Sequence, residues 1–157
     1  MKIMKVFIGL GTNLGDRGFY LSEAVSFLNR PAIKVEAMSK VYESEPWGVA
    51  DQPLFWNQVL QVETTLEPLE LLHICQEIEL QLGRERKVHW GPRTIDIDLL
   101  IYDNRVSDSE ELKLPHPYLE ERAFVIVPLR EIAPDLILPS GKPISEVEGE
   151  GGVYPLT

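Results

Sequence analysis

The sequence of 157 residues predicts an α+β fold whose strands and helices follow in the order β-α-β-β-α-β. Three observations support the prediction: four short segments have the apolar pattern of strands, two longer segments have helical spacing, and glycine, proline or asparagine separates them. No repeat and no Pro/Gly/Ser-rich linker divides the sequence, and its length suits one domain. We therefore expect residues 1–157 to form a single domain.

Four strands are expected from the distribution of apolar residues. The apolar run over residues 3–10 predicts a buried strand, and the alternation of apolar and polar residues over 33–42 predicts a half-buried one. Two more strands are predicted at 55–64 and 94–102. Short apolar segments bounded by turn residues are typical of strands rather than helices.

Two amphipathic segments predict the helices. Apolar residues recur at helical spacing over residues 19–29, where a proline then ends the pattern. The second helix is expected to begin near Pro68, which fits a first helical turn, and to end before Gly83. This order is that of the ferredoxin-like βαββαβ arrangement, an antiparallel sheet with both helices on one face and the other face partly open.

A C-terminal extension follows the last predicted strand. A short helix is expected within residues 119–132, where Pro128 disturbs the pattern. The glycine-rich residues 148–153 are predicted to be a frayed end, because termini without packing partners are commonly poorly ordered.

Composition and charge exclude several classes of protein. There are 25 Asp and Glu residues against 15 Lys and Arg residues, which gives a net charge of −10. Nucleic acid and anionic membrane surfaces bind through cations, so neither is an expected partner. The single cysteine excludes an intramolecular disulfide, and no apolar run approaches the ~20 residues of a membrane-spanning helix. We therefore expect a cytoplasmic protein.

Two aspartates share one side of the strand predicted at 94–102. Asp96 and Asp98 alternate with apolar residues, and strand residues two apart are separated by ~6.6–6.8 Å. Carboxylates are the hard oxygen ligands that Mg²⁺ prefers, and two of them this close need a cation or a shared proton. The spacing alone leaves two interpretations open, which are a metal site and a strand face exposed to solvent.

A basic cluster lies immediately before this strand. Its members are Arg84, Arg86, Lys87 and Arg93, with Glu85 as the one acidic residue among them. The window 84–93 therefore has a net charge of +3 in a chain whose net charge is −10. Arginines next to magnesium-binding carboxylates would suit a phosphate group, and the alternative is a solvated charged loop.

Taken together, these residues resemble the signature of the 6-hydroxymethyl-7,8-dihydropterin pyrophosphokinase family. The signature here is Trp90-Gly-Pro-Arg93-x-x-Asp96-x-Asp98-Leu-Leu. Further similar segments follow in the same order at 11–16, 42–48, 51–57, 76–84 and 115–124. The resemblance implies a monomeric domain that uses two Mg²⁺ ions and transfers pyrophosphate from ATP to 6-hydroxymethyl-7,8-dihydropterin. The products would be AMP and the pterin diphosphate of folate biosynthesis.

The resemblance also implies roles for individual residues. Asp96 and Asp98 would bind the metal ions, and together with Arg84 and Arg93 they would be catalytic. The ATP-binding residues would be Gln76, Arg84, Trp90, Arg93, His116 and Arg122. The pterin-binding residues would be Ser44, Pro46, Trp47, Gly48, Phe55, Asn57 and Phe124.

One part of the pterin site also follows from spacing alone. Phe55 and Asn57 are two residues apart on one predicted strand, so an aromatic ring and an amide face the same side. A flat heterocycle with a hydrogen-bonding edge suits that combination, whereas the alternative for each phenylalanine is the apolar core.

Two other functions remain open from the residues. A nucleotidyltransferase or glycosyltransferase also uses an Asp-x-Asp pair with Mg²⁺. A small-molecule sensor domain of the same fold would need neither the aspartate pair nor the arginine cluster. The products of the reaction distinguish the two enzyme classes, and loss of turnover on replacing the aspartates distinguishes an enzyme from a sensor.

Overall fold

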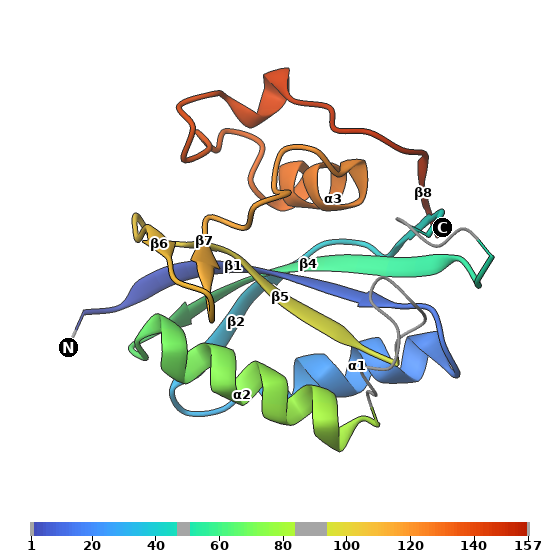
Figure 1. Ribbon diagram of the computed structural model, residues 1–157, viewed down its shortest axis with the longest axis horizontal. Coiled ribbons are helices and arrows are strands. Elements are labelled where there is room, and N and C mark those ends of the chain that lie inside the picture. Colours follow the sequence, from blue (N-terminus) through green and yellow to red (C-terminus); the bar gives the residue numbers. More distant parts are fainter. Residues whose placement is uncertain (1, 47–50, 84–93, 157) are drawn as a thin grey trace.

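The computed structural model describes residues 2–46, 51–83 and 94–156, and it shows an α+β protein built on an antiparallel sheet (Figure 1). The strands of this sheet are β1 (Met4–Thr12), β2 (Ile33–Met38), β3 (Tyr42–Ser44), β4 (Phe55–Thr64), β5 (Asp96–Tyr102) and β8 (Val153–Pro155). Their order is β5-β1-β4-β3-β8, and β2 pairs with β4 beside β3. The predicted α+β class and the antiparallel sheet are therefore confirmed.

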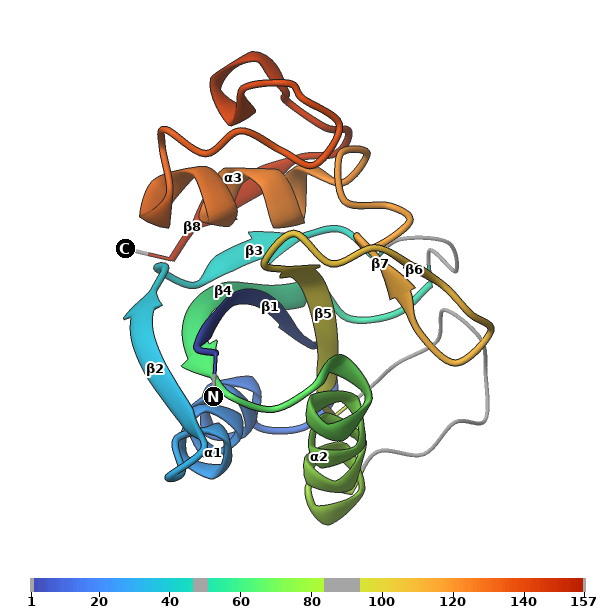
Figure 2. The same cartoon turned by 90° about the vertical axis from the view of Figure 1, so that its left-hand side faces the viewer.

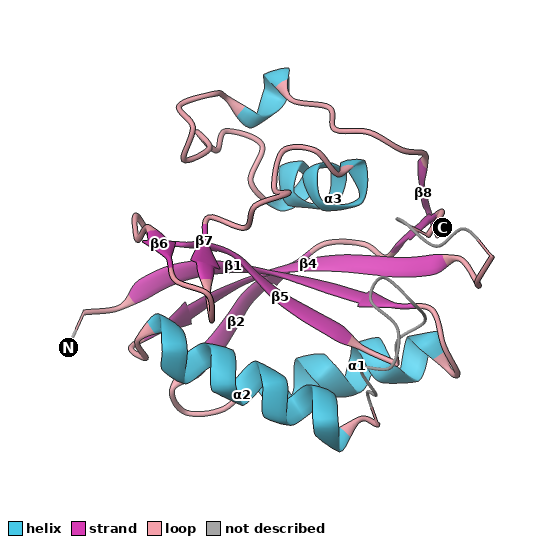
Figure 3. Ribbon diagram, viewed as in Figure 1, coloured by secondary structure: helices cyan, strands magenta, loops and turns pink. Residues whose placement is uncertain are grey.

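Helices lie on both faces of the sheet. Two of them, α1 (Arg17–Leu28) and α2 (Pro68–Gln81), cover one face, and α3 (Ala123–Ile132) lies on the other (Figures 1 and 2). A small hairpin of β6 (Ser107–Asp108) and β7 (Lys113–Leu114) and a 3₁₀ turn, η1 (Ile144–Glu146), complete the described elements (Figure 3). No helix within the described ranges is long and apolar enough to cross a bilayer.

Local sequence explains where the first two helices begin. The Asp16 carboxylate accepts the N–H of Phe19 at 3.0 Å and caps α1. Glu67 and Glu70 form a capping box around Pro68, which starts α2 without losing a hydrogen bond. Each helix then buries a stripe of apolar residues against the sheet, and this explains the spacing in the sequence.

The sheet is buried on both faces by two separate apolar clusters. Ile8 and Leu60 belong to the cluster under α1 and α2. Phe7 and Val59, their neighbours in sequence, belong to the cluster under α3. Successive strand residues face opposite sides, so burial on both sides produces the continuous apolar run of β1.

The single strand predicted over 33–42 is wrong, because Ser39 interrupts it between β2 and β3. The N–H of Ser39 donates to the Val59 carbonyl at 2.9 Å, and the Ser39 hydroxyl accepts the N–H of Val59 at 3.0 Å. The same hydroxyl donates to the Lys40 carbonyl at 2.7 Å. A side chain thus replaces a hydrogen bond between strands, which alternation of apolar residues does not show.

The prediction of a frayed end at 148–153 is also wrong. The backbone of Glu150 forms hydrogen bonds with the two residues that flank Arg122. Its N–H donates to the Glu121 carbonyl at 2.7 Å, and its carbonyl accepts the N–H of Ala123 at 3.1 Å. Strand β8 then pairs with β3. Gly149 has a φ of 72°, and a Cβ atom there would lie 2.6 Å from the Ala123 nitrogen. Glycine in this segment permits a close approach rather than disorder.

Candidate active site

A pocket that is partly open to solvent lies on the α3 face of the sheet. Of the residues predicted to form the site, Ser44, Phe55, Asn57, Asp96, Asp98, Arg122 and Phe124 line it. They come from β3, β4, β5 and the start of α3, so the fold brings together segments that are far apart in the sequence.

Two glycines of β1 form the floor of the pocket. In the ladder between β1 and β5, Gly11 is opposite Asp96 and Gly9 is opposite Asp98. A Cβ atom at Gly11 would lie 3.6 Å from the Asn57 side-chain oxygen and 3.7 Å from the Phe55 ring. The missing side chain therefore leaves space beside the ring, the amide and the carboxylates.

The sequence analysis placed Gly11 just after the strand predicted at 3–10 and gave neither glycine a part in the site. The available signal was two glycines at alternate positions of an otherwise apolar strand. Glycine weakens a strand, and it often marks a place where a ligand or another backbone comes close. Gly9 and Gly11 are consistent with that rule, since both line the pocket.

The Asn57 amide has a fixed orientation. Its nitrogen donates to the Ser44 hydroxyl at 2.8 Å and to the Tyr42 backbone carbonyl at 3.2 Å. A carbonyl can only accept, so the amide nitrogen must face Tyr42 and the amide oxygen must face Gly11. Both Asn57 and Ser44 are buried. The Asn57 side-chain oxygen is therefore a hydrogen-bond acceptor with a fixed position in the pocket, and it suits an N–H donor on a ligand.

Arg122 brings a positive charge to the wall opposite the sheet. It is only 7% exposed, and its guanidinium lies 4.5 Å from the centre of the Tyr118 ring and 5.5 Å from that of Phe124. These distances are those of cation–π contacts. No role was predicted for Tyr118, because nothing local in the sequence shows that its ring meets an arginine four residues later.

His116 faces Asp98 as a neutral side chain. Its Nδ1 accepts the N–H of Tyr118 at 3.1 Å, so the ring proton is on Nε2, which lies 3.8 Å from an Asp98 carboxylate oxygen. Burial, and then the charge of Arg122, lower the pKa of His116 to about 4, although Asp96 acts in the opposite direction. The histidine therefore offers an N–H donor near pH 7, not a positive charge.

The chemistry of Asp96 and Asp98 fits Mg²⁺. Within the described residues, no group of three or more His, Cys, Asp or Glu side chains is placed to hold a metal. Two carboxylates leave most positions around the ion to other oxygen atoms. Mg²⁺ is commonly bound in that way, by one or two carboxylates together with substrate phosphates and water.

Some predicted residues are outside this pocket or outside the described ranges. Pro46, Gln76 and His116 are described but do not line the pocket. The others are Trp47, Gly48, Arg84, Trp90 and Arg93, which lie outside the described residues. Their roles stay predictions.

The fold and the pocket define a small α+β protein in which an aromatic and amide surface adjoins paired carboxylates and an arginine. Residues 7–134 match the family model of 7,8-dihydro-6-hydroxymethylpterin-pyrophosphokinase. The match spans most of the chain, and the chain belongs to this family.

Curated relatives are similar over most of their length. The chain is 47% identical over 135 residues to a 2-amino-4-hydroxy-6-hydroxymethyldihydropteridine pyrophosphokinase of Methylorubrum extorquens, covering 85% of each chain. A protein of the same name from Aquifex aeolicus is 43% identical over 151 residues, covering 96% of this chain and 94% of the relative. One from Pseudomonas aeruginosa is 42% identical over 146 residues, covering 92% and 90%.

Solved structures share the fold at low identity. A Plasmodium falciparum HPPK-DHPS triple mutant with SDX-DHP superposes with a TM-score of 0.75 at 16% identity, covering 92% of this chain. An HPPK-DHPS structure in complex with substrates gives a TM-score of 0.73 at 14% identity. The present chain spans 42% of the latter chain and 41% of the former.

Proposed function

We propose that this protein transfers the pyrophosphoryl group of ATP to 6-hydroxymethyl-7,8-dihydropterin, giving the pterin diphosphate and AMP in folate biosynthesis. Family membership supports the reaction. The observation that connects the reaction to this pocket is the pairing of Asp96 and Asp98 with two glycines, beside Phe55 and Asn57. A flat substrate and paired carboxylates then share one space.

The reduced pterin occupies the part of the pocket between the sheet and α3. The Asn57 side-chain oxygen accepts an N–H of the pterin edge, and the Ser44 hydroxyl holds that amide in place. Phe55 from β4 and Phe124 from α3 stack on the two faces of the ring system. Pro46, Trp47 and Gly48 supply the remaining contacts to its edge, as the family signature implies.

The triphosphate lies toward β5 and Arg122. Asp96 and Asp98 would hold two Mg²⁺ ions, which when bound would neutralise charge on the phosphate oxygens and lower the pKa of a bound hydroxyl. Arg122 supplies a buried positive charge, and the Nε2–H of His116 is available to a carboxylate or a phosphate oxygen. Gln76 and Trp90 complete the nucleotide side, as the family signature implies.

The reaction is an in-line displacement at the β-phosphorus of ATP. The pterin hydroxymethyl oxygen releases its proton to solvent and forms a bond to that phosphorus, and the bond to the oxygen that bridges toward the α-phosphorus breaks. AMP leaves with the electron pair of the broken bond. Arg84 and Arg93 neutralise the negative charge that grows on the transferred and leaving groups.

The domain is proposed to be a ferredoxin-like unit over residues 1–157 that works as a cytoplasmic monomer, with no nucleic acid or membrane partner. The strand order β5-β1-β4 supports the topology, provided that β2 and β3, both paired with β4, count as one interrupted strand. The net charge of −10 supports the absence of a nucleic-acid or anionic-membrane partner.

Product analysis by mass spectrometry tests the proposed function. The protein is incubated with ATP, Mg²⁺ and the reduced hydroxymethylpterin, and we expect AMP and the pterin diphosphate in equal amounts. Without the pterin, no AMP should form. Release of free pyrophosphate with a nucleotidylated product, or release of ADP, would refute the proposal. The double variant Asp96→Asn with Asp98→Asn should keep its fold and lose turnover.

A further inference from the structure

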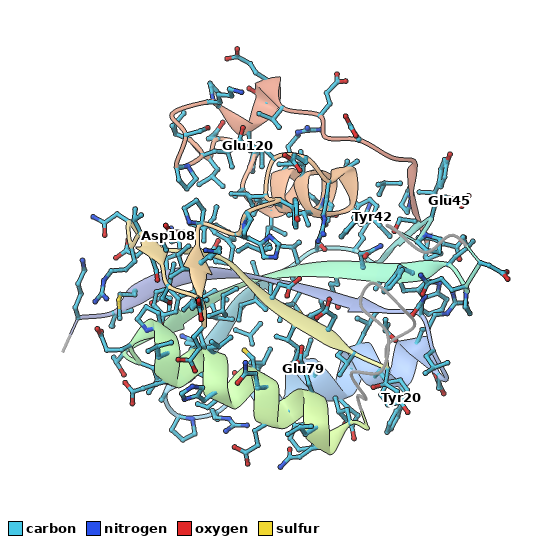
Figure 4. The ribbon with its side chains drawn as sticks, in the orientation of Figure 1. Tyr20, Tyr42, Glu45, Glu79, Asp108 and Glu120 are labelled. Carbon is cyan, nitrogen blue, oxygen red and sulfur yellow. The ribbon has the colours of Figure 1, made fainter. Side chains whose placement is uncertain are left out.

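Glu79 is a buried carboxylate that the proposed reaction does not use. It is on α2 and is 3% exposed, with apolar neighbours such as Cys75 and Ile78 belonging to the cluster between the helices and the sheet. Figure 4 shows it on the side of the sheet that α1 and α2 cover, away from the pocket. Burying a carboxylate is costly unless hydrogen bonds compensate for lost water.

One contact that compensates for this cost is to β5, and it indicates the role of Glu79. A Glu79 carboxylate oxygen accepts the backbone N–H of Ile97 at 2.7 Å, and this hydrogen bond is buried. β5 is at one end of the strand order in the described part of the chain. In the middle of a sheet, a neighbouring strand would accept this backbone N–H. Here the Glu79 carboxylate accepts it instead.

Ile97 is the residue between the two aspartates. Its side chain is 4% exposed and faces the core, whereas Asp96 and Asp98 line the pocket on the opposite side of the strand. A short hydrogen bond at its amide fixes the backbone from which both carboxylates project. An edge strand without such a contact is free to twist or slip.

We propose that Glu79 is a positioning residue for the Asp96–Asp98 pair, holding β5 so that both carboxylates meet the same metal–phosphate group. The proposal rests on the proposed function for the identity of that group. Supporting contacts behind metal ligands commonly change metal affinity or activity by about 10–100-fold when removed.

Two variants separate the reach of the side chain from its charge. Glu79→Gln keeps an oxygen at the same reach and removes the charge, whereas Glu79→Asp keeps the charge and falls short of Ile97 by one methylene group. The matched control is Glu77→Asp on the exposed side of α2. Glu79→Asn, equally short, replaces Glu79→Asp if the latter does not fold.

Two measurements are compared across the variants. Hydrogen exchange of the Ile97 amide, followed by NMR, reports the contact itself. Electron paramagnetic resonance reports Mn²⁺ affinity in the presence of α,β-methylene ATP. In Glu79→Asp we expect exchange on the order of tenfold faster and Mn²⁺ affinity about 10–100-fold weaker. Glu79→Gln should stay within about threefold of wild type in both, and Glu77→Asp should match wild type.

The proposal requires both quantities to change together. A short variant that loses Ile97 protection and keeps wild-type Mn²⁺ affinity would overturn it, as would one that keeps its protection. Glu79→Gln with full protection and weak Mn²⁺ binding would also overturn it, since charge rather than position would then matter. Neither measurement needs turnover, so an inactive wild-type protein would refute the proposed function without deciding this point.

Discussion

At the scale of single residues, Gly11 leaves space in the pocket because it has no side chain. It is opposite Asp96 in the ladder, and a Cβ atom there would touch both the Phe55 ring and the Asn57 amide at ordinary contact distances. The backbone tolerates such an atom, but a ligand would lose the space. Binding and stability therefore respond differently to one methyl group.

Gly11→Ala should weaken pterin binding without unfolding the protein. We expect a loss on the order of tenfold in affinity, or ~1.4 kcal/mol, because overpacking a well-fitted space costs about that much. Isothermal calorimetry with the reduced pterin measures it, and thermal melting checks the fold. Gly18→Ala, where a Cβ atom would lie 3.6 Å from the Trp56 ring, is the control and should bind the pterin normally. Unchanged affinity in Gly11→Ala would show that the ligand lies elsewhere.

At the scale of elements, a partly buried contact joins α3 to the sheet. The Tyr42 hydroxyl donates to a Glu131 carboxylate oxygen at 2.6 Å, and the Lys40 N–H donates to the same carboxylate at 3.0 Å. Figure 4 labels Tyr42 on the α3 side of the sheet. Burial, and then the hydrogen bond and charge of Glu131, raise the pKa of Tyr42 to about 12.

This contact predicts a loss of stability at alkaline pH. The raised pKa means that the folded protein keeps the phenolic proton more tightly than the unfolded chain, whose tyrosines titrate near pH 10. The contribution is full below about pH 10 and disappears as the pH rises through about 12. Urea unfolding between those pH values should show the decline in wild type. Tyr42→Phe should be less stable at neutral pH and show a shallower decline, and an equal slope in both would contradict the prediction.

The C-terminal segment is a second inter-element contact. Through the backbone of Glu150, it forms hydrogen bonds with the residues before and after Arg122. It then continues into β8, which pairs with β3 at Ser44. The segment therefore connects two walls of the pocket. Gly149 makes this route possible, since its backbone comes so close to Ala123 that no Cβ atom fits.

Gly149→Ala should destabilise the protein more than Gly151→Ala does. Both glycines have positive φ, 72° and 103°, so both substitutions impose backbone strain of about 1–3 kcal/mol. Only at Gly149 would the new methyl group also meet backbone atoms within 3 Å, whereas nothing lies within 4 Å at Gly151. Chemical unfolding measures the difference between the two variants. Equal losses would show that the close approach to Ala123 is not maintained in solution.

At the scale of the whole molecule, charge determines how a triphosphate can bind. The protein has a net charge of −10, and both aspartates of the pocket face the proposed phosphate site. Arg122 supplies one cation from the described wall. A polyanion in such a molecule needs added positive charge, which divalent cations bring.

Nucleotide binding should therefore depend strongly on Mg²⁺. Calorimetry with α,β-methylene ATP should show binding with Mg²⁺ and a loss of at least about tenfold in affinity with EDTA, whereas pterin binding without nucleotide should be unaffected. Asp98→Asn should reduce the dependence on Mg²⁺, because one metal-binding charge is gone. Tight binding of the nucleotide without any divalent cation would refute the arrangement.

Features that depend on neighbours along the chain could be predicted without the structure. Alternation placed Asp96 and Asp98 on one side of a strand and Phe55 with Asn57 on one side of another, and these residues line a common pocket. Helical spacing and caps located α1 and α2 closely. The roles of the remaining site residues were predicted from the family resemblance. The membership of the chain in that family is confirmed.

Features that depend on contacts between distant segments became visible when the chain was seen folded. It placed Gly9 and Gly11 opposite the aspartates, buried Glu79 against Ile97 and paired the C-terminal segment with β3. Periodicity reports which side of an element a residue faces, because side chains repeat every 2 or 3.6 residues. It contains no information on register between strands or on the partner that covers a face, since those follow from packing the whole chain at once.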